Sequence, residues 1–152
     1  SPRWLRMQRE RRKAGHKQRG DLRMTDEQTE IVSLFNKLVS EPLHSFPSSG
    51  RMPKEVSSDQ GVYVIYGKEV EVLHVGKSSR GKKGIFQRLT NHLDGLSSFV
   101  ILYFERDKAR VRACNFRYLP IENARKRALL EAYATGCLCP AHIGLNEKTS
   151  SK

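Results

Sequence analysis

Hydrophobic and polar positions recur along the chain with periods that predict both helices and strands. The first helix is expected to begin at Thr25, because Thr25 and Gln28 match a capping box, and to end before Pro42. Residues 42–60 that follow are rich in Pro and Ser, which is typical of a loop. The apolar residues of the helix recur at helical spacing and would form one face: Ile31, Leu34, Phe35, Leu38 and Val39.

A hairpin is predicted after this loop. Strands are expected near residues 61–66 and 70–76, and Gly67-Lys68 would form the turn between them. Acidic and apolar residues alternate at the start of the second strand, so one of its faces is expected to meet water.

The remaining elements follow from the same reasoning. Residues 84–94 carry apolar side chains at helical spacing, and the continuous apolar run 99–105 is suited to a central strand. Residues 109–119 alternate apolar and basic side chains, which predicts a strand with one solvated face. A last helix is expected over 121–135, with Gly136 in its C-cap.

The order helix, strand, strand, helix, strand, strand, helix indicates an α+β domain. A chain of 152 residues is the usual size for one such domain. Within it we expect a basic arm over 1–24, a helix plus Pro/Ser-rich loop over 25–57, a core over 58–147 and a tail over 148–152.

The charge of the chain narrows its expected partners. Lys plus Arg number 28 against 16 Asp plus Glu, a net charge of +12, which favours a polyanion such as nucleic acid. Residues 1–24 hold nine basic and two acidic side chains, and residues 77–88 hold five basic and no acidic ones. No membrane partner is expected, because the sequence contains no long apolar run.

The cysteines are too few and too closely spaced for a disulfide framework. Cys114, Cys137 and Cys139 are odd in number, which favours a reducing, intracellular setting: cytoplasm or nucleoid, or the nucleus of a eukaryote. Cys137, Cys139 and His142 are also of zinc-ligand type, but no second cluster completes a site, so zinc is the less favoured interpretation.

Two triplets in the predicted hairpin change the interpretation. Gly61-Val62-Tyr63 is followed after ten residues by His74-Val75-Gly76, and this pairing resembles the triplets of the GIY-YIG nuclease family. The rest of that family's pattern follows in order: Arg88, His92, Glu131 and Asn146. The resemblance implies a small, three-stranded, mostly antiparallel sheet flanked by helices, here with an N-terminal helical extension.

The resemblance also implies an activity, the Mg²⁺-dependent (or Mn²⁺-dependent) hydrolysis of DNA phosphodiester bonds. Glu131 would be the metal ligand, and Arg88 would neutralise charge on the scissile phosphate. His92 lies one turn from Arg88 and would face the same way. Asn146 would orient another side chain or a water.

The hairpin would supply the groups that handle protons. Tyr63 would hold or deprotonate the attacking water, with Lys77 nearby to lower the Tyr63 pKa. The second triplet of the family normally begins with Tyr, so His74 is a departure. A neutral imidazole is a good base at pH 7, which leaves two alternatives. Either His74 shares the proton transfer and titrates in the ordinary histidine range, about 6 to 7, or Tyr63 alone is the base and the rate continues to rise well above neutral pH.

Double-stranded DNA is the expected partner, held by basic residues that flank the hairpin and the later strands: Arg80, Lys82, Lys83, Arg110 and Arg112. The layout is similar to that of compact, site-specific restriction endonucleases. A nuclease module of a mobile-element, homing or repair protein is the alternative, and a basic nucleic-acid-binding module without catalysis is an alternative of another class. The sequence leaves the oligomeric state open, with a homodimer as one option.

Overall fold

The computed structural model describes residues 3, 6 and 23–145. Backbone contacts divide the chain into two units, Ser1–Glu30 and Ile31–Lys152. The predicted arm over 1–24 falls almost wholly outside the described residues, as do Asn146 and the predicted tail over 148–152.

The first described helix, α3, spans Asp26–Ser40. The predicted capping box is confirmed, since the Thr25 backbone N–H donates to Oε1 of Gln28 at 2.7 Å and the Gln28 N–H donates back to Oγ1 of Thr25 at 3.1 Å. Ile31 and Leu38 are buried, which confirms the predicted apolar face.

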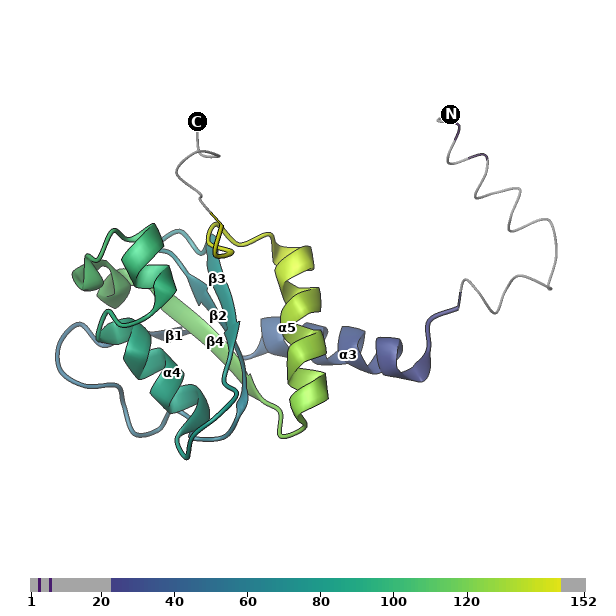
Figure 1. The fold of residues 1–152 in the computed structure, drawn as a ribbon, viewed down its shortest axis with the longest axis horizontal. Helices are drawn as coiled ribbons and strands as arrows, with labels where there is room; N and C mark the ends of the chain where they lie inside the picture. Colours follow the sequence, from purple (N-terminus) through teal and green to yellow (C-terminus); the bar gives the residue numbers. More distant parts are fainter. Residues whose placement is uncertain (1–2, 4–5, 7–22, 146–152) are drawn as a thin grey trace. The chain divides into compact units, whose positions relative to one another are not determined.

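The second unit is built on a four-stranded antiparallel sheet in the order β1-β4-β2-β3 (Figure 1). Its strands are β1 (His44–Ser45), β2 (Gly61–Tyr66), β3 (Val72–Lys77) and β4 (Asn115–Pro120). The predicted hairpin is confirmed as β2 and β3, and β3 is an edge strand. The expectation of three strands was wrong by one, because two residues of the predicted loop pair with β4 as β1.

Of the two later segments predicted as strands, the first is a helical turn and the second is a strand only in its second half. The run 99–105 contains the π-helical turn η2 (Phe99–Tyr103), and 109–119 begins with the 3₁₀ helix η3 (Lys108–Ala113) before β4. A short apolar run has no period that separates a buried strand from a buried helix. In η2 the helical turn buries Phe99 and Val100 and leaves Leu102 48% exposed.

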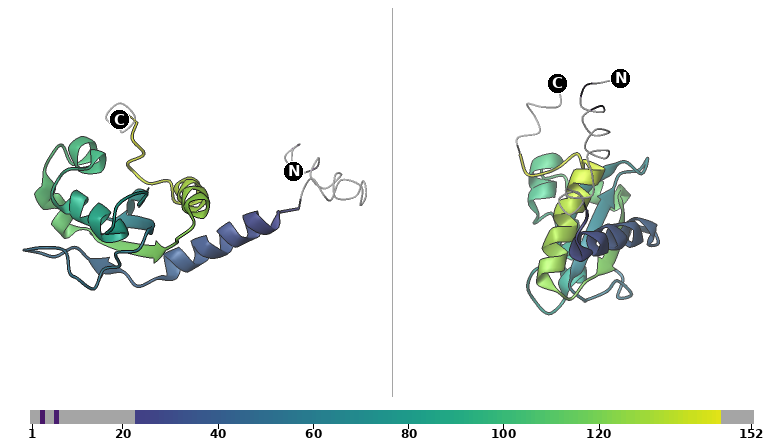
Figure 2. Two further views of the ribbon diagram at one scale, coloured as in Figure 1. Left: turned by 60° about the horizontal axis from the view of Figure 1, so that its bottom comes forward. Right: turned by 90° about the vertical axis from the view of Figure 1, so that its right-hand side faces the viewer.

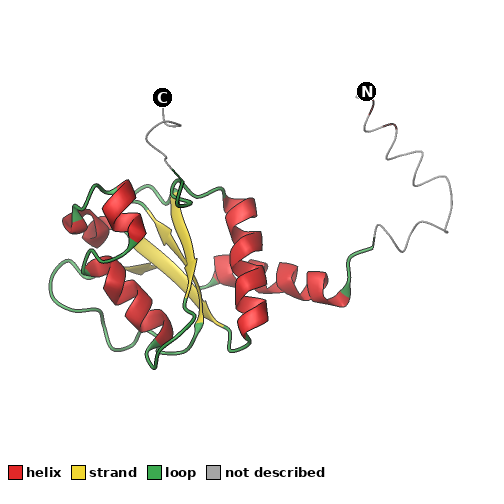
Figure 3. Ribbon diagram, viewed as in Figure 1, coloured by secondary structure: helices red, strands yellow, loops and turns green. Residues whose placement is uncertain are grey.

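Helices cover both sides of the sheet. The helix α4 (Gly84–Leu93) lies on one side and α5 (Ala124–Leu138) on the other, as two views of the ribbon show (Figures 1 and 2). The arrangement is α+β, as predicted (Figure 3). The predicted C-cap of α5 was wrong: Cys139, in the left-handed region with φ of 48°, follows the last turn, so the helix runs past Gly136.

The strand β2 has side chains in both cores. Its odd positions, Tyr63 and Ile65, lie in the cluster on the α4 side, which we call the α4 face. Its even positions, Val62, Val64 and Tyr66, lie in the cluster on the α5 side, which we call the α5 face. Of the helices in the described residues, none has the length and apolar character needed to cross a membrane.

Candidate active site

Tyr63 is the centre of the candidate site. It stands in the middle of β2 and is fully buried, and its hydroxyl shares a hydrogen bond of 2.7 Å with Nε2 of His92. Gly76 is the partner of Tyr63 across the hairpin, and a Cβ atom at that position would overlap the phenol ring and its oxygen. The glycine of the second triplet therefore makes room for the tyrosine of the first.

Charged groups from two further elements act on the Tyr63 hydroxyl. Arg88 from α4 and Glu131 from α5 both lie close enough to alter the Tyr63 pKa, and Lys77 at the end of β3 acts on Glu131. Arg88, Lys77 and Glu131 are each half-buried. The structure thus brings together five of the predicted site residues at the β3 edge of the sheet, where the α4 face and the α5 face meet: Tyr63, Lys77, Arg88, His92 and Glu131.

His92 connects Tyr63 to a residue that the sequence reasoning missed. Its ring is fully buried, and Nδ1 lies 2.6 Å from Oγ of Ser97. That oxygen also accepts a bond of 3.3 Å from the backbone N–H of Val100. Ser97 belongs to no motif, and the one sequence signal at this position is a polar residue between the end of α4 and a long apolar run.

His74 lies against the same cluster from β3. Its ring stacks on Phe99, with centroids 5.0 Å apart and planes at 9°, and stands 5.2 Å from the ring of His92 and 5.4 Å from that of His142. The His74 pKa is lowered to about 3, mainly because burial disfavours the charged ring and also because of the charges of His142 and Arg88, against a hydrogen bond to the His142 backbone. The expectation that His74 titrates in the ordinary histidine range was therefore wrong, because its ring is desolvated.

The pKa values of the neighbouring groups are set mainly by burial too. Burial lowers the His92 pKa well below its usual value. The Tyr63 pKa is raised to about 12, mainly by burial and also by the charge of Glu131, while the charge of Arg88 and a hydrogen bond from it act to lower it. The expected effect of Lys77 on Tyr63 was wrong, since Arg88 is the cation beside the phenol and Lys77 acts on Glu131.

Glu131 has the surroundings of a carboxylate that gains from a nearby cation. Burial raises its pKa, and Lys77 and Arg88 oppose that rise. Among residues 23–145, no three His, Cys, Asp or Glu side chains cluster as metal ligands, so Cys137, Cys139 and His142 form no such group. A lone half-buried carboxylate still fits Mg²⁺, which keeps most of its waters and needs few protein ligands.

The predicted DNA-binding residues fall into two groups. Arg80, Lys82 and Lys83 are exposed in the loop that joins β3 to α4, beside the candidate site. Arg110 stacks over the ring of Phe104 at 4.6 Å. Arg112 donates to the carbonyl oxygens of Pro47 and Gly50 at 2.9 and 3.1 Å, so its guanidinium joins η3 to the loop before β2.

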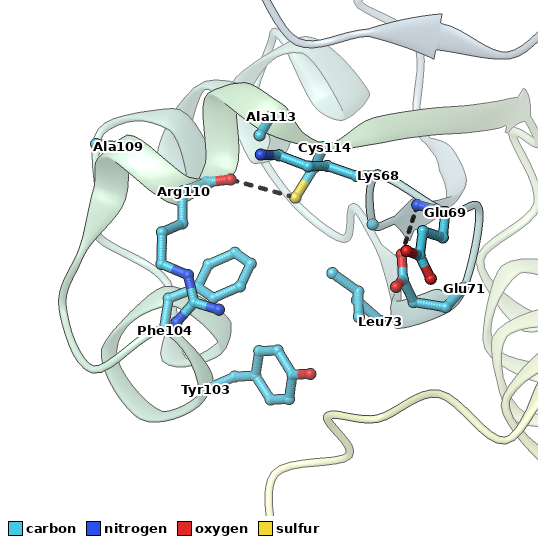
Figure 4. Close-up of a pocket in the computed structure, with 11 residues that line it drawn as sticks. Lys68, Glu69, Glu71, Leu73, Tyr103, Phe104, Ala109, Arg110, Ala113 and Cys114 are labelled. Carbon is cyan, nitrogen blue, oxygen red and sulfur yellow. Dashed lines mark hydrogen bonds between the residues drawn. The ribbon is translucent and has the colours of Figure 1, made fainter.

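A second hollow, of about 640 Å³, opens where the β2–β3 turn approaches η2 and η3 (Figure 4). Glu69 and Glu71 line one side and Arg110 the other, and Cys114 lies between them with its thiol donating to the Arg110 carbonyl oxygen at 3.5 Å. Burial raises the Cys114 pKa to about 11, so the thiol is neutral. The residues that line this hollow include none of the candidate catalytic residues.

Comparison with models of protein families gives no match, and comparison with curated proteins finds none of significant similarity.

Proposed function

We propose that this protein is a metal-dependent endonuclease that hydrolyses phosphodiester bonds in double-stranded DNA, in the manner of a compact GIY-YIG restriction enzyme. The observation that carries the proposal is the proximity of Tyr63, Arg88 and Glu131, which come from three different elements, with Arg88 acting on the ionisation of both Tyr63 and Glu131. Phosphodiester hydrolysis needs a group that handles the proton of a water and positive charge beside the phosphate oxygens. Tyr63 and Arg88 are suited to those two tasks.

The roles of the side chains follow from their positions. Arg88 would donate two N–H bonds to the oxygens of the scissile phosphate and stabilise the charge that develops there. Tyr63 would hold the attacking water, and in its ionised form it would take the water's proton as the water oxygen bonds to phosphorus and the ester oxygen departs. Arg88 also favours the ionised phenol, which partly offsets the effect of burial.

Glu131 is the residue that would hold the metal, Mg²⁺ or Mn²⁺. When bound, the ion would add positive charge beside the phosphate and help the leaving oxygen to depart. Lys77, which acts on the same carboxylate, would keep it ionised in the absence of the ion.

The charge of the chain supports DNA as the substrate. The net charge is +12, and the exposed Arg80, Lys82 and Lys83 lie in the loop that leads from the hairpin into α4. Cations in this position would contact phosphates on either side of the scissile one, with no dependence on base sequence.

A plasmid assay tests this proposal. Supercoiled DNA is incubated with the protein in Mg²⁺ or in EDTA, and wild type is compared with Glu131→Gln. We expect cleavage in Mg²⁺ only, with loss of cleavage but not of DNA binding in Glu131→Gln. The matched control is Glu122→Gln, because Glu122 is an exposed carboxylate just before α5.

The outcomes separate the alternatives. DNA binding without cleavage by wild type would indicate a non-catalytic binding module and contradict the proposal. Cleavage by Glu131→Gln within tenfold of wild type would contradict the role of Glu131. Sequencing of the product ends then distinguishes a site-specific enzyme, which gives discrete ends, from a non-specific one.

A further inference from the structure

We propose that Gln60 is a positioning residue for DNA binding, which holds the loop between β3 and α4 in the conformation that presents its cations to phosphates. This loop covers residues 78–83, which we call the basic loop, and it carries Arg80, Lys82 and Lys83 in exposed positions. The inference rests on the proposed function for its partner, DNA, but it does not depend on cleavage.

Both ends of the basic loop are fixed to the segment that leads into β2. At the first end, the Ser78 backbone N–H donates to the Gly61 carbonyl at 3.0 Å, and Oγ of the fully buried Ser78 accepts from the Gly61 N–H at 2.8 Å. At the other end, the Ile85 N–H donates to the Asp59 carbonyl at 2.9 Å. The approach is close there, because a Cβ atom on Gly84 would overlap the Asp59 carbonyl.

Gln60 holds the middle of the loop. Residues 79–83 are exposed, and the side-chain amide of Gln60 donates from Nε2 to the carbonyl oxygen of Gly81 at 2.7 Å. Gly81 adopts φ of +89°, and a Cβ atom at this position would have no neighbour within 4 Å. Glycine is therefore suited to this position by the backbone turn that it allows and not by a lack of space. The bond from Gln60 anchors that turn, with Arg80 on one side and Lys82 on the other.

Stability alone does not explain this side chain. A carbonyl oxygen can only accept, so Nε2 of Gln60 faces Gly81 and Oε1 is turned away from it. Among the described residues, Oε1 has no hydrogen-bond partner, although it is buried. A buried acceptor without a partner is unfavourable, and a single hydrogen bond to an exposed group returns little net stability. The Gln60 amide is therefore better explained by the loop that it holds.

An ordered loop strengthens DNA binding without adding a contact. A loop that is mobile before binding must be fixed when its cations meet phosphates, and the lost conformational freedom reduces affinity. A loop already held by Gln60 avoids this loss. The salt dependence of binding is the same in both cases, because it follows the number of phosphates neutralised. Affinity and salt dependence together therefore separate loop order from loop charge.

The hydrogen bond to the loop is tested with Gln60→Met, which keeps an unbranched side chain of similar length and removes the amide. Nitrogen-15 relaxation of the backbone amides of residues 79–83, measured on the intact free protein, reports their order. We expect an ordered loop in wild type and greater mobility in the variant, with no loss of unfolding free energy in urea. Equal mobility in the two proteins would overturn the inference, and a loss of unfolding free energy would assign Gln60 a structural role instead.

DNA binding is measured by fluorescence anisotropy with a short labelled duplex, at several salt concentrations and in EDTA to prevent metal-dependent cleavage. Gln60→Met should raise Kd roughly 5–30-fold, the effect of fixing one further loop residue on binding, with an unchanged slope of log Kd against log[salt]. Lys82→Ala removes a cation and should reduce that slope by about 1. Gln87→Met is the matched control and should leave Kd unchanged, because the Gln87 amide donates within α4, to Oδ1 of Asn91 at 2.8 Å.

Each outcome of the binding assay has a separate meaning. A Kd of Gln60→Met equal to that of wild type would overturn the inference, even if the loop becomes mobile. A reduction in slope as large as that of Lys82→Ala would also overturn it, because the substitution would then have removed a phosphate contact. Absence of DNA binding by wild type would contradict both this inference and the proposed function, whereas DNA binding without cleavage would contradict the proposed function alone.

Discussion

The two faces of the sheet are built from alternate residues of the same strands, yet their buried side chains differ in chemical type. On the α5 face, the buried hydrophobic cluster is aliphatic apart from Tyr66, with members such as Val62, Leu119 and Leu130. On the α4 face, the hydrogen-bonded side chains of Tyr63, His92 and Ser97 lie in an otherwise apolar cluster, and His74 stacks on Phe99 beside them. Both faces are buried, but the cluster on the α5 face serves packing, whereas the cluster on the α4 face also encloses polar groups.

Under the proposed function, the comparison indicates how a buried polar group would reach a substrate. Tyr63 lies in an interior strand, but Gly76 on the edge strand has no side chain to block its hydroxyl. Glu131 and Lys77 approach the same edge from α5 and from the end of β3. The candidate site is thus formed where the two faces meet, and each face contributes a different kind of group.

Removal of the Tyr63 hydroxyl should have the largest effect on activity. Tyr63→Phe retains the ring in the core but leaves Nε2 of His92 without its partner, at a cost of about 1–3 kcal/mol in unfolding free energy. The cleavage rate per folded molecule should fall by about 10²–10⁴-fold, the usual contribution of a group that transfers a proton. The rate is measured under single-turnover conditions. A loss of less than tenfold would mean that the polar groups of the α4 face do not carry out the reaction.

A cavity on the α5 face should give the reverse pattern. Leu119→Ala removes a buried side chain, 4% exposed, from the partner strand of β2 and should lower the unfolding free energy by about 2–5 kcal/mol. Cleavage per folded molecule should remain near wild type, since no polar group is displaced. Urea denaturation and the same single-turnover assay test both parts, and a rate loss as large as that of Tyr63→Phe would erase the distinction between the faces.

The buried histidines should make the α4 face sensitive to acid. The His74 pKa is about 3 in the folded state against 6.5 in the unfolded chain, so below about pH 6.5 the unfolded state binds a proton that the native state does not. Stability should therefore fall as the pH is lowered, by about 1.4 kcal/mol per pH unit for each such histidine. His92 acts in the same direction, and Glu131, whose pKa is raised, acts in the opposite one.

His74→Phe isolates the contribution of one histidine. A phenyl ring at this position can retain the stacking on Phe99. The unfolding free energy is measured by urea denaturation between about pH 6 and about pH 4. Its slope against pH should be smaller in the variant than in wild type by the amount that corresponds to one proton, about 1.4 kcal/mol per pH unit. An equal slope in the two proteins would show that the His74 ring is not held neutral.

Hydrophobic periodicity was sufficient to predict the hairpin and the helices α3 and α4, because these elements have clear periods. It failed where no period exists. The run around Phe99 is apolar throughout, so helix and strand could not be distinguished, and β1 is two residues long within a loop rich in Pro and Ser.

The candidate site was predictable only in part. Tyr63, Arg88 and Glu131 were predicted because the motifs resemble those of GIY-YIG nucleases, and the structure brings the three side chains close enough to interact. The surroundings that set their protonation could not be predicted, because the desolvation of His74 depends on how Phe99 and His142 pack around it. Ser97 could not be found either, since its contact with His92 depends on the turn at Gly95 and no motif marks it.

The pH dependence of cleavage tests the central claim most directly. Single-turnover cleavage by wild type is measured at saturating Mg²⁺ from about pH 6.5 to about pH 9, a range that spans the ordinary histidine pKa. Because the Tyr63 pKa is about 12, the ionised phenol increases about tenfold with each pH unit, and the rate should rise with it throughout this range. A rate that levels off above about pH 7 would assign the proton transfer to a histidine and contradict the account.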